Sequence, residues 1–398
     1  MKRFLPFFAA LTFLVSALTG CGGSAPASSQ ESSSAAASSA ISQPEEDRGP
    51  NLSLVPENAV FVDGSDPLTG GSVDRDDESR PIAIMLQNDK RGYPQWGIGA
   101  AEVVVEAITE GTQTSMMAMY SGHEGLPAKV GAVGPGRDLF WQMAMPTDSV
   151  LMQIGSNIYA DNLLNYYGYQ NLDGHYVGVA AYDLDYEKSK TANNEYCWYT
   201  NQELMRDGLE HYGLSEDGDR QSLFNFAPED DESEFGGEEA DQIEITFAEE
   251  NTVPLTYNED EGGWDKYDLD WEPQVDGGYS EEIGVEDKML RFDNVLVLYC
   301  SAGIKDDGYT RDYDLTGGTG LYLYGPACQK IRWEKPAEDR GFTIYDESGE
   351  NELPVRVGKT YIAVYGGFDG QDVSVQANGE ALELWDDPEP MPTPDDEE

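Results

Sequence analysis

The segment "KVGAVGPGRDLFWQMAM", residues 129–145, places three glycines, a proline and an arginine ahead of an apolar run with helical spacing. Free backbone N–H groups and the dipole at the start of a helix attract anions. Arg137 would add a two-pronged contact to the oxygens of such an anion. The residue types therefore indicate one candidate chemistry, anion binding at the entrance to a helix.

The alternative for the same segment is a tight turn between a strand and a helix. Gly131, Gly134 and Gly136 permit positive φ, and Pro135 suits the first turn of a helix, where an N–H lacks a partner anyway. No other basic residue stands beside Arg137, and anion sites need clustered donors. We interpret the loop mainly as a turn, with Arg137 paired to a local carboxylate such as Asp138 or Glu110.

Glu106 and Glu110 raise a second chemistry, the hydrolysis of a glycosidic bond. Retaining glycosidases hold two carboxyl groups about 5–5.5 Å apart, and inverting ones about 6.5–9.5 Å apart. The run "VVVEAITE" favours a strand, in which four positions at about 3.3 Å each separate the two carboxylates by about 13 Å. An ion pair of either glutamate with Arg137 is therefore the preferred interpretation.

Other catalytic signatures are missing from the sequence. It contains no Ser-x-x-Lys motif and no Gly-x-Ser-x-Gly nucleophile elbow. The histidines His123, His175 and His211 lie far apart, and no two cysteines have the Cys-x-x-Cys spacing of a zinc or redox site. We therefore expect no metal and no cofactor, and we favour a protein that is not an enzyme.

Cysteine usage leaves one question open. Besides Cys21 the chain has Cys197, Cys300 and Cys328, and three cysteines cannot all pair within one chain. Cys300 and Cys328 each end a strand-like run, so a disulfide between them is one option in an oxidising exterior. The other option is that both thiols stay free.

The elements that position these residues divide into two groups. In the first half, apolar and β-branched runs at 80–86, 101–108, 114–121 and 149–155 predict strands, and 135–145 and 156–168 predict helices, the second ended by Gly168. In the second half, runs at 241–248, 294–301, 319–325, 329–335, 342–346 and 359–366 predict strands with no long helix between them. The expected fold class is α+β, with a mixed α/β domain followed by a mostly β domain.

The amino terminus predicts the location of the protein. Lys2 and Arg3 precede an uncharged run from Phe4 to Leu18, which is shorter than the roughly 20 residues that span a bilayer. Small residues and Cys21 follow in "LTGC", which resembles a bacterial lipobox at the end of a secretory signal. We therefore expect Cys21 to be lipidated and the protein to be held on the extracytoplasmic face of the cell membrane.

A tether and a strong negative charge follow. The Ser/Ala-rich segment offers no apolar surface to bury, and its about 35 residues reach roughly 30 Å on average. Removing Lys2 and Arg3 from 24 basic residues leaves 22 against 76 acidic ones, a formal charge of −54. Such a field repels nucleic acid. Three acidic runs, 227–244, 249–273 and 386–398, lack the spacing of a calcium loop, so we interpret them as solvated surface.

Several short pieces, in order along the chain, carry a family resemblance. The chain resembles the YerB-like lipoproteins of Gram-positive bacteria, a two-domain envelope family without an established biochemical function. The pieces are "DPLTG" (66–70), "RPIAIMLQN" (80–88), "PQWGI" (94–98), "AEVVVEAITEG" (101–111), "KVGAVGPGRD" (129–138), "DNVLVLY" (293–299), "TGGTGLYLY" (316–324), "IRWEKP" (331–336) and "GKTYIAV" (358–364).

The resemblance also implies a polar site. It retains Asn88, Gln95, Glu106, Glu110 and Arg137, which we take as candidate ligand-binding residues. The family often has arginine or histidine where this chain has Asp89, Tyr93, Ser115 and Gly134. If those basic groups form an anion pocket in relatives, this chain has lost most of it.

These observations combine into one expected organisation: a signal peptide (1–20), a tether (21–57), an α/β domain (58–225), an acidic connector (226–240), a β-rich domain (241–385) and a disordered acidic tail (386–398). The favoured function is a binding or accessory protein of the cell envelope, with a wall component or an envelope protein as partner. The alternative is a wall glycan hydrolase that uses Glu106 and Glu110.

The lipobox generates the first test. Replacing Cys21→Ala removes the thiol that would carry the lipid, so the protein should move from the membrane fraction to the soluble fraction in a fractionation experiment. Equal membrane retention of the variant and the parent protein would contradict anchoring through Cys21.

Overall fold

The computed structural model describes residues 64–73, 79–122, 125–177, 180–218, 221–268, 274–277 and 289–392. The predicted signal, Cys21 and the tether lie outside these residues. No helix within the described ranges is long and apolar enough to cross a membrane.

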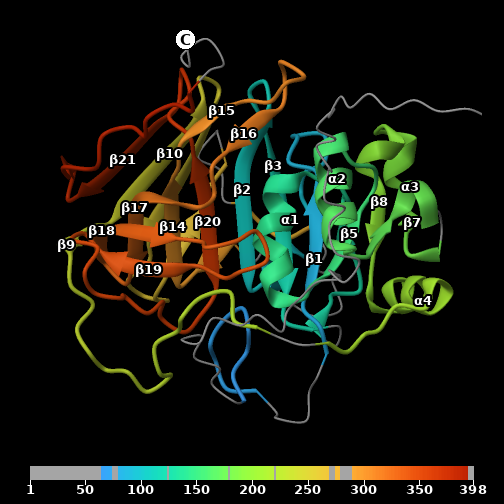
Figure 1. The fold of residues 1–398 in the computed structure, drawn as a ribbon, viewed down its shortest axis with the longest axis horizontal. Coiled ribbons are helices and arrows are strands. Elements are labelled where there is room, and N and C mark those ends of the chain that lie inside the picture. Colours follow the sequence, from blue (N-terminus) through green and yellow to red (C-terminus); the bar gives the residue numbers. More distant parts are fainter. Residues whose placement is uncertain are drawn as a thin grey trace, which may run out of the picture. The chain divides into compact units, whose positions relative to one another are not determined.

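A large mixed sheet runs through the described chain. Its strand order is β19-β18-β17-β14-β20-β2-β3-β1-β5-β6, with β9 paired to β18 (Figure 1). The strands are β1 (Ile82–Leu86), β2 (Val103–Glu110), β3 (Gln113–Tyr120), β5 (Val150–Gln153), β6 (Asn171–Asp173), β9 (Glu238–Glu239), β14 (Asn294–Tyr299), β17 (Gly317–Tyr324), β18 (Ala327–Glu334), β19 (Thr343–Asp346) and β20 (Thr360–Tyr365).

The junction between β2 and β20 unites the two halves of the sequence. The two strands pair in parallel from Val103 opposite Thr360 to Ala107 opposite Val364. The α/β half and the β-rich half therefore share one sheet, and the helices and strands confirm the predicted fold class. This ladder connects a strand of the first half of the sequence to a strand of the second half.

The directions of the strands decide where a site can form. β1 is parallel to β5, and β2 is parallel to β20, while β3 runs antiparallel to both β1 and β2. The carboxyl ends of β1, β2, β5 and β20 consequently lie at the same edge of the sheet. Ligands of open α/β sheets bind outside this edge.

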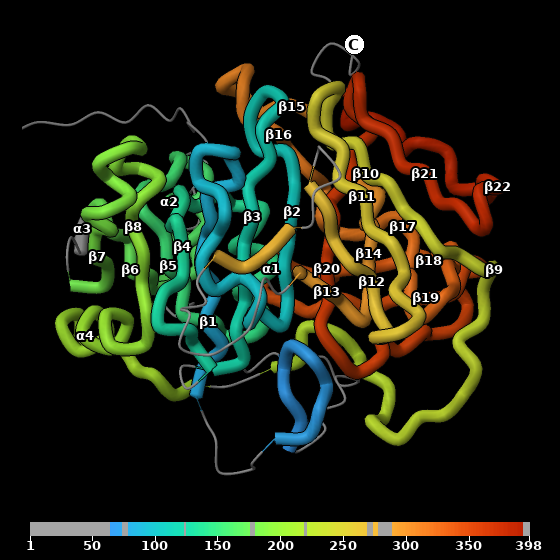
Figure 2. Tube along the Cα trace, turned by 180° about the vertical axis from the view of Figure 1, so that it is seen from behind, coloured from blue at the N-terminus to red at the C-terminus, as the bar shows by residue number. Residues whose placement is uncertain are grey.

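A second sheet covers one face of the first. Its order is β13-β12-β11-β10-β21-β22, and Figure 2 shows β10, β11 and β12 in front of β14, β17 and β20. The strands are β10 (Gln242–Ala248), β11 (Asn251–Tyr257), β12 (Trp264–Lys266), β13 (Arg291–Phe292), β21 (Asp372–Ala377) and β22 (Glu380–Ala381).

The second sheet corrects the interpretation of the acidic run 249–273 as solvated surface. This run contributes β11 and β12, and all three residues of β12 are buried. Trp264 is fully buried in the core between the two sheets. The acidic side chains conceal the pattern because they lie mainly in the turns, whereas Val253, Leu255 and Trp264 form the buried face.

Helices α1 (Asp138–Ala144) and α2 (Ile158–Tyr167) cover the other face of the large sheet over its α/β half (Figure 1), whereas the buried side chains of α4 (Gln202–Tyr212) belong to the core on the face of the second sheet. In α2 the side chain of Asn157 accepts a hydrogen bond from the N–H of Ala160, and Gly168 ends the helix with φ 63° as predicted. The helices are α1 (Asp138–Ala144), α2 (Ile158–Tyr167), α3 (Gly174–Val177) and α4 (Gln202–Tyr212), with 3₁₀ turns η1 (Ile98–Ala100), η3 (Met145–Thr147), η5 (Lys188–Lys190) and η6 (Asn194–Tyr196). Small strands complete the fold: β4 (Val130–Gly131), β7 (Asp183–Leu184), β8 (Trp198–Thr200), β15 (Ala302–Ile304) and β16 (Arg311–Tyr313).

The strand periodicity builds a core on each face. In β2, Val103 and Val105 pack toward α1, while Val104 and Ile108 pack toward the second sheet. Both faces of β2 are buried, which is why its sequence reads as a nearly continuous apolar run. Glu106 interrupts that run on the face that meets the second sheet.

The cysteines do not form the disulfide that the sequence left open. Cys197, Cys300 and Cys328 are buried free thiols. Cys300 belongs to the core on the helix side of the sheet, and Cys328 to the core on the opposite side. Because the sheet lies between them, burial in separate cores accounts for their remaining unpaired.

The end of the chain stays in contact with the fold beyond residue 385. The hydroxyl of Tyr365 donates to Asp387 at 2.6 Å, and the N–H of Met391 donates to the carbonyl of Ala302 at 2.8 Å. Residues 386–392 of the predicted tail thus contact the β-rich half. The rest of the tail, 393–398, lies outside the described residues.

The shared sheet generates a stability prediction. Ile362 in β20 is fully buried, so Ile362→Ala should lower the free energy of unfolding by about 2–5 kcal/mol. The matched control is Ile304→Ala in β15, where the side chain is 54% exposed and the expected change is within about 0.5 kcal/mol. Urea unfolding measures both. Equal costs for the two variants would contradict the central position of β20.

Candidate functional site

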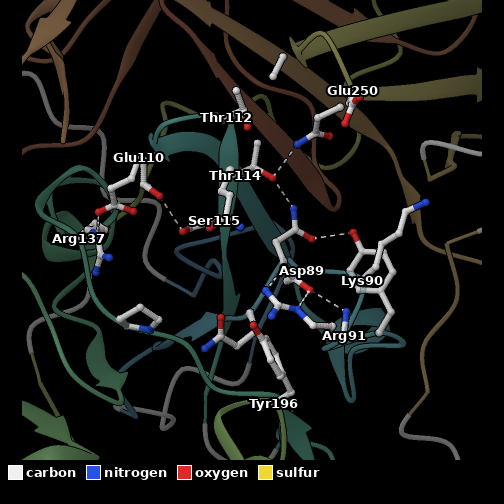
Figure 3. A pocket seen from close by; sticks show the side chains of 18 of the residues that line it. Asp89, Lys90, Arg91, Glu110, Thr112, Thr114, Ser115, Arg137, Tyr196 and Glu250 are labelled. Atoms are coloured by element: carbon white, nitrogen blue, oxygen red, sulfur yellow. Dashed lines mark hydrogen bonds and ion pairs between the residues drawn. The ribbon is translucent and has the colours of Figure 1, made fainter. Parts of the chain in front are cut away.

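A polar groove with a volume of about 880 Å³ lies at the carboxyl ends of β1 and β2 (Figure 3). Four segments supply its walls: the loop after β1, the β2–β3 hairpin, the approach to α1 and the β10–β11 turn, with Tyr196 added from η6. Its lining consists of residues 87–91, Tyr93, 109–110, 112–115, Pro135, Arg137, Tyr196 and 248–252. The groove therefore draws on both halves of the sequence.

The loop that leads into α1 acts as a turn. The N–H of Gly134 donates to the carbonyl of Met85 at 2.8 Å, and the N–H of Gly136 donates to the carbonyl of Gly155 at 2.8 Å. These donors are used within the fold, and Pro135 has none. Helix α1 begins only at Asp138, so Pro135 precedes the first turn of the helix rather than occupying it.

The glycines of this loop are required for close approach, not for positive φ. Gly131, Gly134 and Gly136 are absent from the positive-φ residues, which corrects the sequence interpretation. A Cβ at Gly134 would meet the backbone carbon of Leu86 at 3.0 Å, and one at Gly136 would overlap the side chain of Gln153. Sequence alone cannot separate these two uses of glycine.

Arg137 stands directly before the first residue of α1 and pairs with Glu110, which confirms the predicted ion pair. Its Nε donates to Glu110, and its Nη1 donates to the carbonyl of Gly136 at 2.8 Å. The two side chains are 16% and 14% exposed. The pair forms one side of the groove, and Lys90 lies on the other side of the view in Figure 3.

A second ion pair lies in the loop after β1. Arg91 donates from two nitrogens to the two carboxylate oxygens of Asp89, both at 2.7 Å. The hydrogen bond from Arg91 lowers the pKa of Asp89, so this carboxylate stays ionised. The guanidinium also lies 4.8 Å from the centre of the Tyr196 ring. Asp89 therefore neutralises the charge of its neighbour Arg91.

Glu106 lies beneath the groove rather than in its lining. The side chain is 1% exposed. Its Oε1 accepts hydrogen bonds from Asn88 at 2.8 Å and from Thr114 at 3.1 Å. Its Oε2 accepts a hydrogen bond from the Tyr361 hydroxyl at 2.8 Å and lies 3.2 Å from the Nζ of Lys266. Both oxygens are thus committed to protein groups.

Gln95 and Lys266 extend this buried network into the second sheet. Lys266 donates to Gln274 at 2.7 Å, and Gln274 donates to the side chain of Gln95 at 3.2 Å. Gln95 in turn donates to Asn88 at 3.1 Å. Burial lowers the pKa of Lys266, while the charge of Glu106 opposes that change. The network gives the buried amine of Lys266 two acceptors, Gln274 and Glu106.

The five candidate residues therefore divide into two groups. Asn88, Glu110 and Arg137 line the groove, whereas Gln95 and Glu106 lie in the buried network. Asn88 joins the groups: its Nδ2 donates to Glu106 and its Oδ1 accepts from Tyr93 at 2.9 Å. The two glutamates belong to separate networks, so the structure does not present them as facing carboxylates.

Sequence reasoning missed several residues of the site. Lys266, Gln274 and Tyr361 complete the buried network, and Asn251 and Thr112 line the groove. The one usable signal was Lys266, a lone lysine within an otherwise acidic run. Nothing in the sequence connects it to Glu106, 160 positions earlier. Of the four positions at which the resemblance led us to expect a basic residue, Asp89, Tyr93 and Ser115 line the groove and Gly134 does not.

Comparison with known proteins now places the chain. Residues 68–215 match the N-terminal domain of a family described as a protein of unknown function (DUF3048), and residues 243–362 match its C-terminal domain. The chain belongs to the DUF3048 family. The two matched segments are the two halves joined by the β2–β20 ladder.

A relative and a solved structure support the same assignment. A chain from Bacillus subtilis strain 168, named "Putative lipoprotein YerB", is 25% identical over 313 residues, which span 77% of this chain and 88% of the relative. The crystal structure of YerB from B. subtilis matches with a TM-score of 0.63 at 22% identity and covers 78% of this chain and 99% of that one. The fold is shared, which confirms the family resemblance.

The buried network generates a test of its energetics. Replacing Glu106→Gln leaves the charge of Lys266 buried without a counter-ion, which should cost about 3–5 kcal/mol of unfolding free energy. Glu110→Gln breaks the half-buried pair with Arg137 and should cost about 1 kcal/mol or less. The double variant Glu106→Gln with Lys266→Met should recover most of the loss. Urea titrations compare the three, and equal effects of the two single variants would contradict the argument.

Proposed function

We propose that this chain is an extracytoplasmic lipoprotein, anchored through Cys21, that binds a polymer of the cell wall in the groove without transforming it. The lipobox and the tether support the anchor, and the name of the B. subtilis relative agrees with it. A polar groove of about 880 Å³ is large enough for several residues of a polymer.

The proposal that the groove binds without catalysis rests on Glu106 and Glu110, whose carboxylates are both bonded to other protein groups. Glu106 is buried and both its oxygens are bonded to protein groups, while Glu110 is paired with Arg137. A general acid or base has to reach the proton that it transfers. Glu106 has no open path to a ligand in the groove, so the pair lacks the arrangement of a glycosidase.

Among the residues that the structure describes, no metal-ligand cluster and no exposed thiol takes the place of these glutamates. Within the described ranges, no group of three or more His, Cys, Asp or Glu side chains is placed to hold a metal ion. The three cysteines in those ranges are buried, and burial raises the pKa of each thiol. Raised pKa values keep the thiols protonated and weakly nucleophilic, which supports binding over turnover.

Wall sedimentation tests the proposal. The mature chain carrying Cys21→Ala, purified without a lipid, should co-sediment with intact peptidoglycan sacculi and release no soluble fragments. Asn251, which donates to Thr114 at 3.3 Å on the groove wall, is the residue to remove. Asn251→Ala should weaken retention by about two- to tenfold, the loss of one hydrogen bond.

The matched control is Asn165→Ala on the exposed side of α2, away from the groove lining, and it should leave retention unchanged. Release of soluble fragments by the parent protein would favour the hydrolase instead, and repeating the assay with Glu110→Gln would then identify the acid or base. Absence of any sedimentation would contradict wall binding.

A further inference from the structure

We propose that the groove takes an uncharged, hydroxyl-rich ligand, a segment of neutral oligosaccharide, and not an ion or a charged peptide. This inference rests on the proposed function and names the ligand class for the same groove. It follows from which polar groups of the lining are already used and which are open.

The basic groups of the groove are already engaged within the protein. Arg91 makes two hydrogen bonds to Asp89, and Arg137 bonds to Glu110 and to the carbonyl of Gly136. Lys90 also has a partner within the fold. An anionic ligand would have to displace these carboxylates against the field of a chain with a formal charge of −52. The groove is therefore unsuited to anions.

The open groups of the groove are uncharged. The side chains of Gln87, Thr112 and Gln113 have no hydrogen-bond partner among the residues that the structure describes. They come from two segments, the loop after β1 and the β2–β3 hairpin, and Thr112 and Gln113 are exposed. Asn251 adds a carbonyl oxygen from the start of β11, because only its Nδ2 is used.

Amides and hydroxyls both donate and accept hydrogen bonds, as the hydroxyl groups of a sugar do. Because these groups are exposed, water satisfies them in the free protein. A hydroxyl-rich ligand replaces both the donated and the accepted hydrogen bonds, whereas a phosphate mainly accepts and an ammonium only donates. The chemistry of the open set therefore matches a chain of sugar hydroxyls better than a phosphate or an ammonium group.

The remaining lining residues fit the same ligand. Tyr93 is half-buried, and its hydroxyl is fixed by Asn88, so its ring is a preset part of the groove wall. Burial raises the pKa of Tyr93, so the ring stays neutral. Glu249 and Glu250 are exposed in the β10–β11 turn, where carboxylates accept from hydroxyls and repel anionic polymers.

Calorimetry with defined probes tests the inference on the mature chain carrying Cys21→Ala. An N-acetylglucosamine hexamer and maltohexaose serve as uncharged probes, a polyglycerol phosphate as the anionic probe and a free pentapeptide as the charged peptide. At least one uncharged probe should bind, with a Kd that changes less than about twofold between 0.05 and 0.5 M salt, since screening acts on charges. The anionic and peptide probes should bind at least tenfold more weakly.

Variants locate the site. Gln113→Ala should raise the Kd of the uncharged probe about two- to tenfold, the loss of one hydrogen bond. The matched control is Gln170→Ala, an exposed glutamine outside the lining, which should change nothing. Equal effects of the two variants would overturn the assignment of the ligand to the groove.

The outcomes also separate this inference from the proposed function. Binding of the anionic polymer or the peptide with strong salt dependence, together with retention on sacculi, would overturn the inference and leave wall binding in place. Failure of every probe together with failure to sediment with sacculi would overturn both. Binding of an uncharged probe that responds to Gln113→Ala supports both.

Discussion

The buried pair of Glu106 and Lys266 is the interaction on which the rest of the structure depends. It joins β2 in the large sheet to β12 in the second sheet, with the two charged atoms 3.2 Å apart and both side chains at most 2% exposed. Burying two charges costs several kcal/mol each unless hydrogen bonds satisfy the remaining lone pairs and protons. Here Asn88, Thr114 and Tyr361 satisfy the carboxylate, and Gln274 accepts from the ammonium. A shift of one sheet over the other would break all of these contacts, so the pair determines how the two sheets are aligned.

This constraint reaches the groove through Asn88. One end of its amide bonds to Glu106, and the other accepts from Tyr93, which is part of the groove wall. Asn251 on the second sheet likewise reaches Thr114 on the first. The groove therefore exists only when both family segments are in place, since one supplies the loop after β1 and the β2–β3 hairpin and the other supplies the β10–β11 turn. The hydrogen bonds beneath the groove thus connect residues of both sheets.

Most individual strands and helices could be predicted from the sequence, but the pairing of distant strands could not. The strands of the large sheet and the two main helices followed from apolar periodicity and from Gly168, because those signals act within about ten residues. The parallel pairing of Val103 with Thr360 could not be read, since nothing local specifies a partner more than two hundred positions away. Strand β12 was not predicted for a different reason. Its Asp265 and Lys266 are residue types typical of the surface, but they are buried in ion pairs with Arg291 and Glu106. The pairing of Arg137 with Glu110 was predictable because each residue stands at an end of its element: Glu110 ends β2, and Arg137 directly precedes α1.

The distribution of charge gives the groove its character. The chain carries a formal charge of −52, and an open basic pocket in such a molecule would attract anions against the field of the whole protein. The pairs Asp89–Arg91 and Glu110–Arg137 avoid that conflict by cancelling locally. They also hold two long side chains in place, so less side-chain entropy is lost when a ligand arrives. A neutral ligand does not feel the net charge to first order, and its affinity then depends on shape and hydrogen bonds alone. A strongly acidic chain is thus compatible with the proposed uncharged ligand, because the two ion pairs cancel charge within the groove and an uncharged polymer is not repelled by the carboxylates that remain.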